Sequence, residues 1–138
     1  MIRYIVILLL SWNIIYADKI QWSHNYVDAL SISKKVHKPV YLFITTPGCQ
    51  WCNKFETTTL TDPKTIKYIA NNFVALHLVA SRDTIPEKFA QFAFPRHYFL
   101  DQQGNIIFKA LGYRDAELFI SIAQTALQRY VKKNKEKK

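Results

Sequence analysis

The two cysteines, Cys49 and Cys52, constrain this chain more than any other feature of its sequence. They enclose Gln50 and Trp51, and they follow the continuous apolar run at residues 40–44. A Cys-x-x-Cys pair that ends a strand and opens a helix makes one thiol reactive and gives it a partner that completes the reaction. The pair therefore indicates thiol–disulfide exchange, on a fold in which a buried strand leads directly into a helix.

Residues 1–17 have the layout of a signal peptide. A positively charged start, with Arg3, is followed by two apolar stretches, and the expected cleavage point lies between Ala17 and Asp18. A membrane-spanning helix needs about 20 apolar residues, and Asn13 interrupts this shorter segment. We therefore expect an exported protein, periplasmic or otherwise, whose cysteines face an oxidising compartment. Ile15 stands where a small residue is usual, so an uncleaved membrane tether is the alternative.

One domain and a short basic tail account for the rest of the chain. Residues 18–131 are enough for one adequate core, and no Pro/Gly/Ser-rich linker or repeat divides them. The chain carries 19 Lys and Arg against 10 Asp and Glu, and residues 129–138, which include the expected tail at residues 132–138, hold six Lys and Arg against one Glu. A terminal lysine run is usually a solvated helix end, with an anionic membrane or an acidic partner as the alternative. We expect no nucleic-acid partner.

The apolar patterns alternate between helical and strand spacing along the domain. They predict helices that start near Ser23, Cys49, Asp62, Thr84 and Asp115, the first ending at Pro39 and the fourth broken by Pro95. Predicted strands cover residues 40–44, 73–79, 98–101 and 106–109, with residues 102–105 closing a hairpin. We expect a core that includes Phe73, Phe89, Phe92 and Phe119. This order predicts an α/β fold, a mixed sheet of four to five strands with helices on both faces.

Several short motifs match those of a known family. They are Ala29-Leu30 after Trp22, Lys38-Pro39-Val40, the cysteine pair, Phe55-Glu56, Leu60-Thr61-Asp62-Pro63, Phe94-Pro95 before Tyr98-Phe99-Leu100-Asp101, Gly104, and Gly112-Tyr113. With these motifs, from Trp22 to about Leu127, the chain resembles thioredoxin-fold proteins, and most of all the exported thioredoxin-like group that includes the periplasmic C-terminal domain of the disulfide reductase DsbD. The resemblance implies a thioredoxin-like fold without cofactors, substrate proteins bound through transient mixed disulfides, and a membrane electron donor.

The resemblance and the chemistry of thiols agree on the site residues. An ordinary cysteine of pKa ~8.5 is only about 3% ionised at pH 7. At a helix start, free N–H groups and the helix dipole favour the thiolate of Cys49 by up to ~2 kcal/mol. Cys49 is thus the expected nucleophile and Cys52 the resolving thiol. The resemblance makes Pro95 the proline held in the cis form beside the pair, where Phe94 would pair with a substrate segment. Trp51 either contacts substrate or packs over the helix start.

The chain departs from the thioredoxin pattern in three places. Phe43 stands where a buried acid assists the second thiol, Asn53 replaces a lysine, and no proline separates the cysteines. Glu56, one turn after Cys52, is either a proton carrier or a solvated carboxylate. The four histidines have no metal-ligand spacing, and His97 is the one that could approach the thiols. We expect no metal site.

Three other functions stay open at this stage. A disulfide across so short a loop stabilises a fold by only ~2 kcal/mol, against ~3 kcal/mol for a fifteen-residue loop, so a purely structural staple is disfavoured. A non-catalytic binding module with a permanently oxidised pair is the second alternative. An oxidase of the same fold is the third, because Gln50 and Trp51 do not constrain the redox potential. We favour a reductase of protein disulfides.

Overall fold

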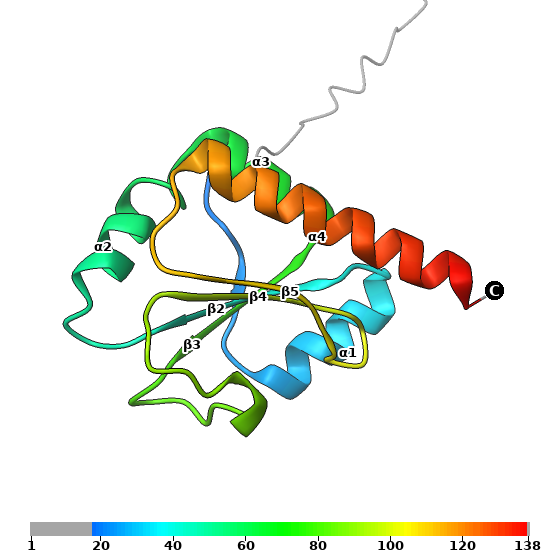
Figure 1. The fold of residues 1–138 in the computed structure, drawn as a ribbon, viewed down its shortest axis with the longest axis horizontal. Coiled ribbons are helices and arrows are strands. Elements are labelled where there is room, and N and C mark those ends of the chain that lie inside the picture. The colour runs from blue at the N-terminus through cyan, green and yellow to red at the C-terminus, as the bar shows by residue number, and fades with distance from the viewer. Residues whose placement is uncertain (1–17, 138) are drawn as a thin grey trace, which may run out of the picture.

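The computed structural model describes residues 18–137, and the expected signal peptide at residues 1–17 lies outside the described residues. The chain forms a five-stranded sheet with helices on both faces (Figure 1), which confirms the predicted α/β fold. In chain order the elements are β1 (Trp22–Ser23), α1 (Tyr26–Val36), β2 (Val40–Thr45), α2 (Gln50–Thr57), α3 (Pro63–Asn72), β3 (Val74–Val79), the single 3₁₀ turn η1 (Glu87–Phe89), β4 (Arg96–Leu100), β5 (Ile106–Leu111) and α4 (Ala116–Glu136).

The strand order brings the predicted parts of the site to one edge of the sheet. The order is β1-β3-β2-β4-β5, in which β1, β3 and β2 run parallel, and β4 is antiparallel to both β2 and β5. The cysteine loop follows the C-terminal end of β2, and Ile44 near that end pairs with Arg96 at the start of β4. Pro95 therefore lies beside the end of β2 that leads into Cys49.

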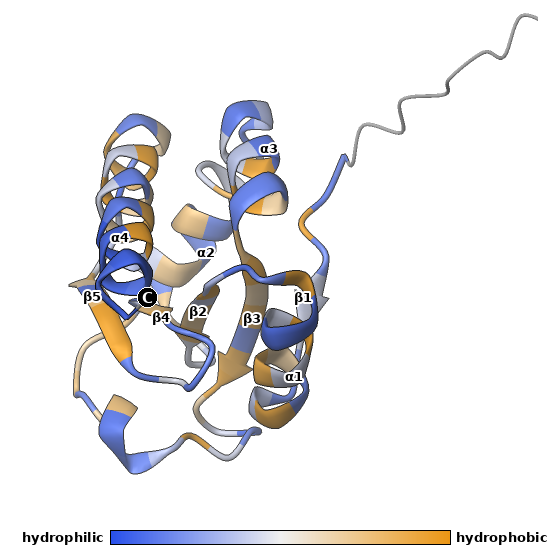
Figure 2. Ribbon diagram, turned by 90° about the vertical axis from the view of Figure 1, so that its right-hand side faces the viewer, coloured by the Kyte–Doolittle hydropathy of each residue, from blue (hydrophilic) through white to orange (hydrophobic). Residues whose placement is uncertain are grey.

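Two apolar layers form the core, one on each face of the sheet. The central strand β2 is buried along its whole length because its alternate residues face opposite layers. Tyr41 and Phe43 belong to the layer beneath α2, α3 and α4, whereas Val40, Leu42 and Ile44 belong to the layer that α1 and η1 cover. Figure 2 shows hydrophobic strands between helices with hydrophilic sides. The helix that carries Cys52 therefore rests on the first, aromatic-rich layer.

The first helix begins later than predicted, and the prediction that Ser23 caps it is wrong. Trp22 and Ser23 form β1, which pairs with β3. Asn25 caps α1 instead, because its side chain accepts a hydrogen bond from the backbone N–H of Asp28 at 3.0 Å. Pairing at the sheet edge thus overrides the helical spacing that Trp22 shares with the residues of α1.

The predicted helix from Thr84 through Phe92 is also wrong. This segment contains only the turn η1, preceded by Pro86, and no side chain caps it. Pro86 fixes its own φ and disfavours the helical region for Ile85, so a helix does not extend back to Thr84. Phe89 is buried as predicted, but Phe92 is fully exposed, and the prediction that it belongs to the core is wrong.

The last helix continues through the segment that was expected to be a tail. Asp115 is the N-cap of α4, and its carboxylate accepts a hydrogen bond from the backbone N–H of Leu118. Near the other end, Nζ of Lys133 lies 2.8 Å from Oδ2 of Asp101, a buried carboxylate that follows β4. The helix is therefore fixed to the body of the domain as far as Lys133. Between residues 18 and 137, every helix is too short or too polar to cross a membrane.

Candidate active site

Cys49 and Cys52 lie at the start of α2 and form a disulfide, with their Cα atoms 5.2 Å apart. Cys49 is the N-cap of the helix, and its Sγ accepts a hydrogen bond from the backbone N–H of Cys52 at 3.1 Å. The positive end of the helix therefore points at the Cys49 sulfur, an arrangement that stabilises a thiolate in the reduced state. Cys49 is partly exposed, whereas Cys52 is 2% exposed. The pair can thus offer one sulfur to another protein while the other sulfur stays shielded.

The loop between β2 and α2 makes a tight turn at Gly48. Its φ of 72° lies in the left-handed region that favours glycine. The turn is closed by the backbone N–H of Cys49, which donates to the carbonyl of Thr46 at 3.3 Å. This turn brings the chain from the buried strand to the surface within a few residues, which is why Cys49 is accessible although β2 is not.

Trp51 packs against Tyr113 and Lys54, and 50% of its surface is exposed. Its ring centroid lies 5.9 Å from that of Tyr113. The ammonium of Lys54 lies 5.2 Å from the Trp51 ring centroid and 4.8 Å from that of Tyr113, within the range of cation–π contacts. Both readings of Trp51 thus have a physical basis, because one part of the indole is packed and the rest is free. Its contact with substrate stays a prediction.

The Phe94–Pro95 peptide bond is cis, the form that the resemblance implied. Pro95 is buried, and its carbonyl accepts a hydrogen bond from the backbone N–H of Gly112 at 2.8 Å. Phe94 is half-buried, with the guanidinium of Arg96 4.2 Å from its ring centroid. Among residues 18–137, the N–H and C=O groups of Phe94 have no backbone partner. These groups are free to pair with an extended segment, although substrate binding here stays a prediction.

An aromatic cluster fills the place of the missing buried acid. The ring centroid of Phe43 lies 5.3 Å from that of Phe55 on α2 and 5.7 Å from that of His97. His97 is 1% exposed; its Nδ1 lies 2.9 Å from the Tyr41 hydroxyl and its Nε2 2.9 Å from the Gly112 carbonyl. Burial lowers the pKa of His97 to about 4, although the bond to Gly112 opposes this shift. His97 is therefore a neutral core residue whose two ring nitrogens are already bonded, not a group free to serve the thiols.

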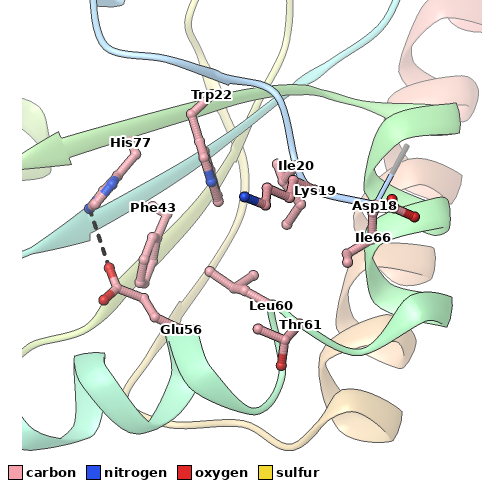
Figure 3. Close-up of a pocket in the computed structure, with 10 residues that line it drawn as sticks. All are labelled: Asp18, Lys19, Ile20, Trp22, Phe43, Glu56, Leu60, Thr61, Ile66 and His77. Carbon is pink, nitrogen blue, oxygen red and sulfur yellow. Dashed lines mark ion pairs between the residues drawn. The ribbon is translucent and has the colours of Figure 1, made fainter. Parts of the chain in front are cut away.

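A cavity of about 420 Å³ lies beside α2 on the same layer (Figure 3). Its lining is formed by Asp18, Lys19, Ile20, Trp22, Phe43, Glu56, Leu60, Thr61, Ile66 and His77. Half of these side chains are apolar, and Glu56 and His77 are in polar contact with each other at the cavity wall. The cavity gives the carboxylate of Glu56 access to solvent from the side of the helix.

Glu56 and His77 form a polar pair next to the aromatic cluster. Oε1 of Glu56 lies 3.9 Å from Nε2 of His77, and the same nitrogen lies 2.8 Å from Oγ1 of Thr45. Burial raises the pKa of Glu56 and lowers the pKa of His77 to about 4. His77 is thus neutral at pH 7, so the contact is polar rather than an ion pair. Glu56 is one helical turn after Cys52, on the same face of α2.

The fold and the cysteine pair agree with a known family. The thioredoxin-like domain family matches residues 26–127, and the chain belongs to it. One relative is the disulfide bond reductase DsbH of Chlamydia pneumoniae, which is 33% identical over 106 residues. The match covers 65% of this chain and 61% of DsbH, so the chain spans less than two thirds of that relative's length.

Solved structures confirm the thioredoxin-like fold. The DsbH oxidoreductase superposes with a TM-score of 0.70 at 23% identity, covering 87% of this chain and 92% of that one. A thioredoxin from Thermus thermophilus gives 0.67 at 18% identity, covering 80% and 90%. The oxidised C-terminal domain of DsbD from Neisseria meningitidis gives 0.61 at 19% identity, covering 72% and 90%. The predicted resemblance to the DsbD domain is thereby confirmed.

Three residues in contact with Trp51, Phe43 or Glu56 received no role in the sequence prediction. They are Lys54, Tyr113 and His77. A signal existed for Lys54, because a spacing of three residues on a helix places it next to Trp51. His77 is placed by the parallel register of β2 and β3, in which it pairs with Phe43, and the sequence does not specify that register.

Proposed function

We propose that the protein is an exported thiol–disulfide oxidoreductase that reduces disulfides of substrate proteins. One observation carries the proposal: a partly exposed Cys49 caps α2 and is joined to a shielded Cys52 within a thioredoxin-like domain. The relative DsbH is named a disulfide bond reductase, which supports both the activity and its direction. The layout of residues 1–17 supports export.

The reaction runs in two exchanges. In the reduced protein, the Cys49 thiolate attacks one sulfur of a substrate disulfide; a new S–S bond forms, and the second substrate sulfur leaves as a thiolate that takes a proton from water. The Cys52 thiol then loses its proton and attacks the Cys49 sulfur. The Cys49–Cys52 disulfide forms, and the first substrate sulfur leaves. The substrate has gained two electrons, and the protein is left in the oxidised state seen here.

The proton of Cys52 needs an acceptor, because Phe43 occupies the place of the usual acid. We assign this role to Glu56, which shares a face of α2 with Cys52 and opens onto the solvent-connected cavity. A carboxylate whose pKa is raised by burial is a better proton acceptor than a fully solvated one. His77, neutral and bonded to Thr45, is a polar neighbour of the Glu56 carboxylate at 3.9 Å.

Electrons and substrates come from partners. The Cys49–Cys52 disulfide must be reduced again for each turnover, and we assign this step to a membrane electron donor. Substrate proteins would bind along the free backbone groups of Phe94, beside Pro95, with the exposed half of Trp51 as a further contact. The pairing of Ile44 with Arg96 brings Pro95 beside the end of β2 that leads into Cys49, which supports this edge as the binding site.

The electrostatics of the site favour a reductase over an oxidase. A strong oxidant stabilises its reduced form through a thiolate of pKa about 3.5, which needs ~7 kcal/mol relative to an ordinary cysteine. The helix dipole supplies at most ~2 kcal/mol. The nearby ammonium of Lys54 lies against Trp51 and Tyr113 rather than against a sulfur. The other cation in this part of the fold, Arg96, donates to three backbone carbonyls rather than to a sulfur.

Reduction of insulin disulfides tests the proposal. With a chemical thiol as the electron source, the wild-type protein should precipitate the insulin B chain catalytically, and Cys49→Ser should not. A binding module with a permanently oxidised pair would leave precipitation at the slow uncatalysed rate of the chemical thiol in both cases. That result would reject the enzyme in favour of the second candidate.

A further inference from the structure

Arg96 is a buried cation that none of the described acidic residues neutralises. It is 5% exposed, it begins β4, and it follows Pro95 directly. Between residues 18 and 137, its guanidinium forms no ion pair with a carboxylate. Burial of a charge is costly unless hydrogen bonds or other polar contacts compensate it. The contacts of the Arg96 guanidinium therefore indicate the structural role of this buried charge.

The guanidinium of Arg96 is bonded to three carbonyl groups of one short segment. Nε donates to the carbonyl of Ala93 at 3.0 Å, Nη1 to that of Phe89 at 2.9 Å, and Nη2 to that of Gln91. The Cζ atom of the same group lies 4.2 Å from the ring centroid of Phe94. All four contacts belong to the six residues before Pro95, so one side chain holds the whole segment.

This segment has little other support. Residues 91–94 belong to no helix or strand, and among residues 18–137 they take part in no backbone–backbone hydrogen bond. Gln91, Phe92 and Ala93 are exposed. The hydroxyl of Tyr98 donates to the Phe89 carbonyl at 3.3 Å, which fixes only the start of the segment. Without the guanidinium, Phe94 would be held only by its own packing and by its attachment to Pro95.

We propose that Arg96 is a positioning residue for substrate recognition, which holds residues 89–94 in the shape that presents Phe94 to a substrate protein. This inference rests on the proposed function, in which the backbone of Phe94 pairs with the substrate. An arginine is required because a planar fork with five donors can reach three carbonyl groups and stack on an aromatic ring at once. A lysine keeps the charge, but its ammonium offers a single point of contact.

The test compares a large substrate with a small one. Arg96→Lys is assayed for reduction of a disulfide-bonded peptide and, separately, for the reaction of its reduced form with dithionitrobenzoate, a small disulfide that needs no recognition edge. We expect KM for the peptide to rise about tenfold, equivalent to about 1.4 kcal/mol, with kcat and the small-disulfide rate within about twofold of wild type. The matched control is Arg82→Lys, an exposed arginine earlier in the same connection that bonds to Asp83, and both rates should match wild type.

Two results would overturn the inference. One is an unchanged peptide KM in Arg96→Lys, and the other is an equal loss on both substrates, which would mean that the cysteines themselves are disturbed. A double-mutant cycle adds a second criterion. Because Arg96 acts through Phe94, Phe94→Leu alone should raise the peptide KM, and the double mutant should have a KM little higher than that of Phe94→Leu. Fully additive effects contradict the proposal.

Phe94→Leu keeps the inference testable if Arg96→Lys does not fold. If thermal melting shows that Arg96→Lys is unfolded, Phe94→Leu alone decides, because it removes the ring on which the Arg96 guanidinium stacks and leaves the three hydrogen bonds of that group in place. A peptide KM equal to that of wild type then rejects the inference, and a raised KM with a normal small-disulfide rate supports it. Failure of the proposed function is recognised separately, because in that case the wild-type protein itself does not reduce the peptide.

Discussion

The buried imidazole of His97 accepts a hydrogen bond from the hydroxyl of Tyr41 at its Nδ1, 2.9 Å away. Since the carbonyl of Gly112 can only accept, the ring hydrogen resides on Nε2, 2.9 Å from that oxygen. Protonation of Nδ1 would place a hydrogen against the Tyr41 hydroxyl in a dry aromatic core. His97 is thus held neutral by the same contacts that join β2, β4 and the residue after β5.

Acid should therefore destabilise the protein well above the pH at which carboxylates titrate. The pKa of His97 falls from an ordinary 6.5 to about 4 in the folded state, so below pH 6.5 the unfolded chain binds a proton that the folded chain does not. The contribution is fully present above pH 6.5 and is lost as the pH falls toward 4, by about 3 kcal/mol. His77 acts in the same direction.

Urea unfolding at pH 7 and pH 4.5 measures this effect. His97→Gln should be less stable than wild type at pH 7, and its loss of stability between the two pH values should be smaller by about 2 to 3 kcal/mol. An unchanged pH dependence in the variant would show that His97 is already protonated in the fold. His37→Gln serves as the control, since this histidine is exposed and lies at the C-terminal end of α1.

The two cysteines should behave differently when each is removed. Cys49→Ser should abolish exchange with a substrate disulfide, whereas Cys52→Ser should keep the first attack and accumulate mixed disulfides, because only the resolving step is lost. The reason is the geometry of α2, which exposes Cys49 and shields Cys52. A non-reducing gel of both variants after incubation with substrate checks this. Equal trapping by both would refute the assignment of roles.

Glu56→Gln should slow the resolving step more than the first attack. Mixing reduced protein with dithionitrobenzoate releases one chromophore at each step, so the two rates are measured in one experiment. Loss of the proton acceptor should reduce the second rate by about 10²-fold at pH 7 and leave the first within about threefold. Glu117→Gln, in the first turn of α4, is the matched control. Equal slowing of both phases would assign Glu56 to the fold rather than to proton transfer.

Asp101 should be a stability determinant that ties the last helix to the sheet. Its carboxylate is buried and accepts hydrogen bonds from the backbone N–H groups of Gln103 and Asn105 and from Nζ of Lys133. Burial raises its pKa, and these bonds with Lys133 and Asn105 outweigh burial, so the pKa is lowered overall. Asp101→Ala should cost about 3 kcal/mol, because it leaves several donors without a partner.

Thermal or urea unfolding of three variants tests that prediction. Lys133→Met should destabilise by about 1 kcal/mol, since it removes one partner of a buried carboxylate, and Lys132→Met should have no measurable effect. If Lys133→Met also has no effect, the end of α4 behaves as the solvated tail that the sequence suggested.

The sequence predicts the part of the fold that depends on local signals. The buried run of β2, the start of α2 at Cys49 and the Asp62-Pro63 start of α3 are each visible as a short pattern, and each is found. The same holds for Gly104 in the β4–β5 turn, where φ is 82° and an added Cβ would clash with the Tyr26 hydroxyl.

The errors arise where tertiary contacts decide. Trp22 has helical spacing with α1, but pairing with β3 makes it an edge strand. Phe92 resembles a core residue, but Pro86 interrupts the helix that would have buried it. The pairing of His77 with Phe43 and the four contacts of Arg96 depend on strand register and on the path of a loop. Neither is encoded in a local pattern.

The equilibrium of the Cys49–Cys52 pair with glutathione tests the central claim most directly. Quenching mixtures of known composition and separating the reduced and oxidised forms gives the reduction potential of the pair. A reductase should be more reducing than about −200 mV, nearer to the value of about −270 mV typical of thioredoxin. A potential near about −120 mV, together with a Cys49 thiolate of pKa below about 5, would contradict the account and make the protein an oxidase.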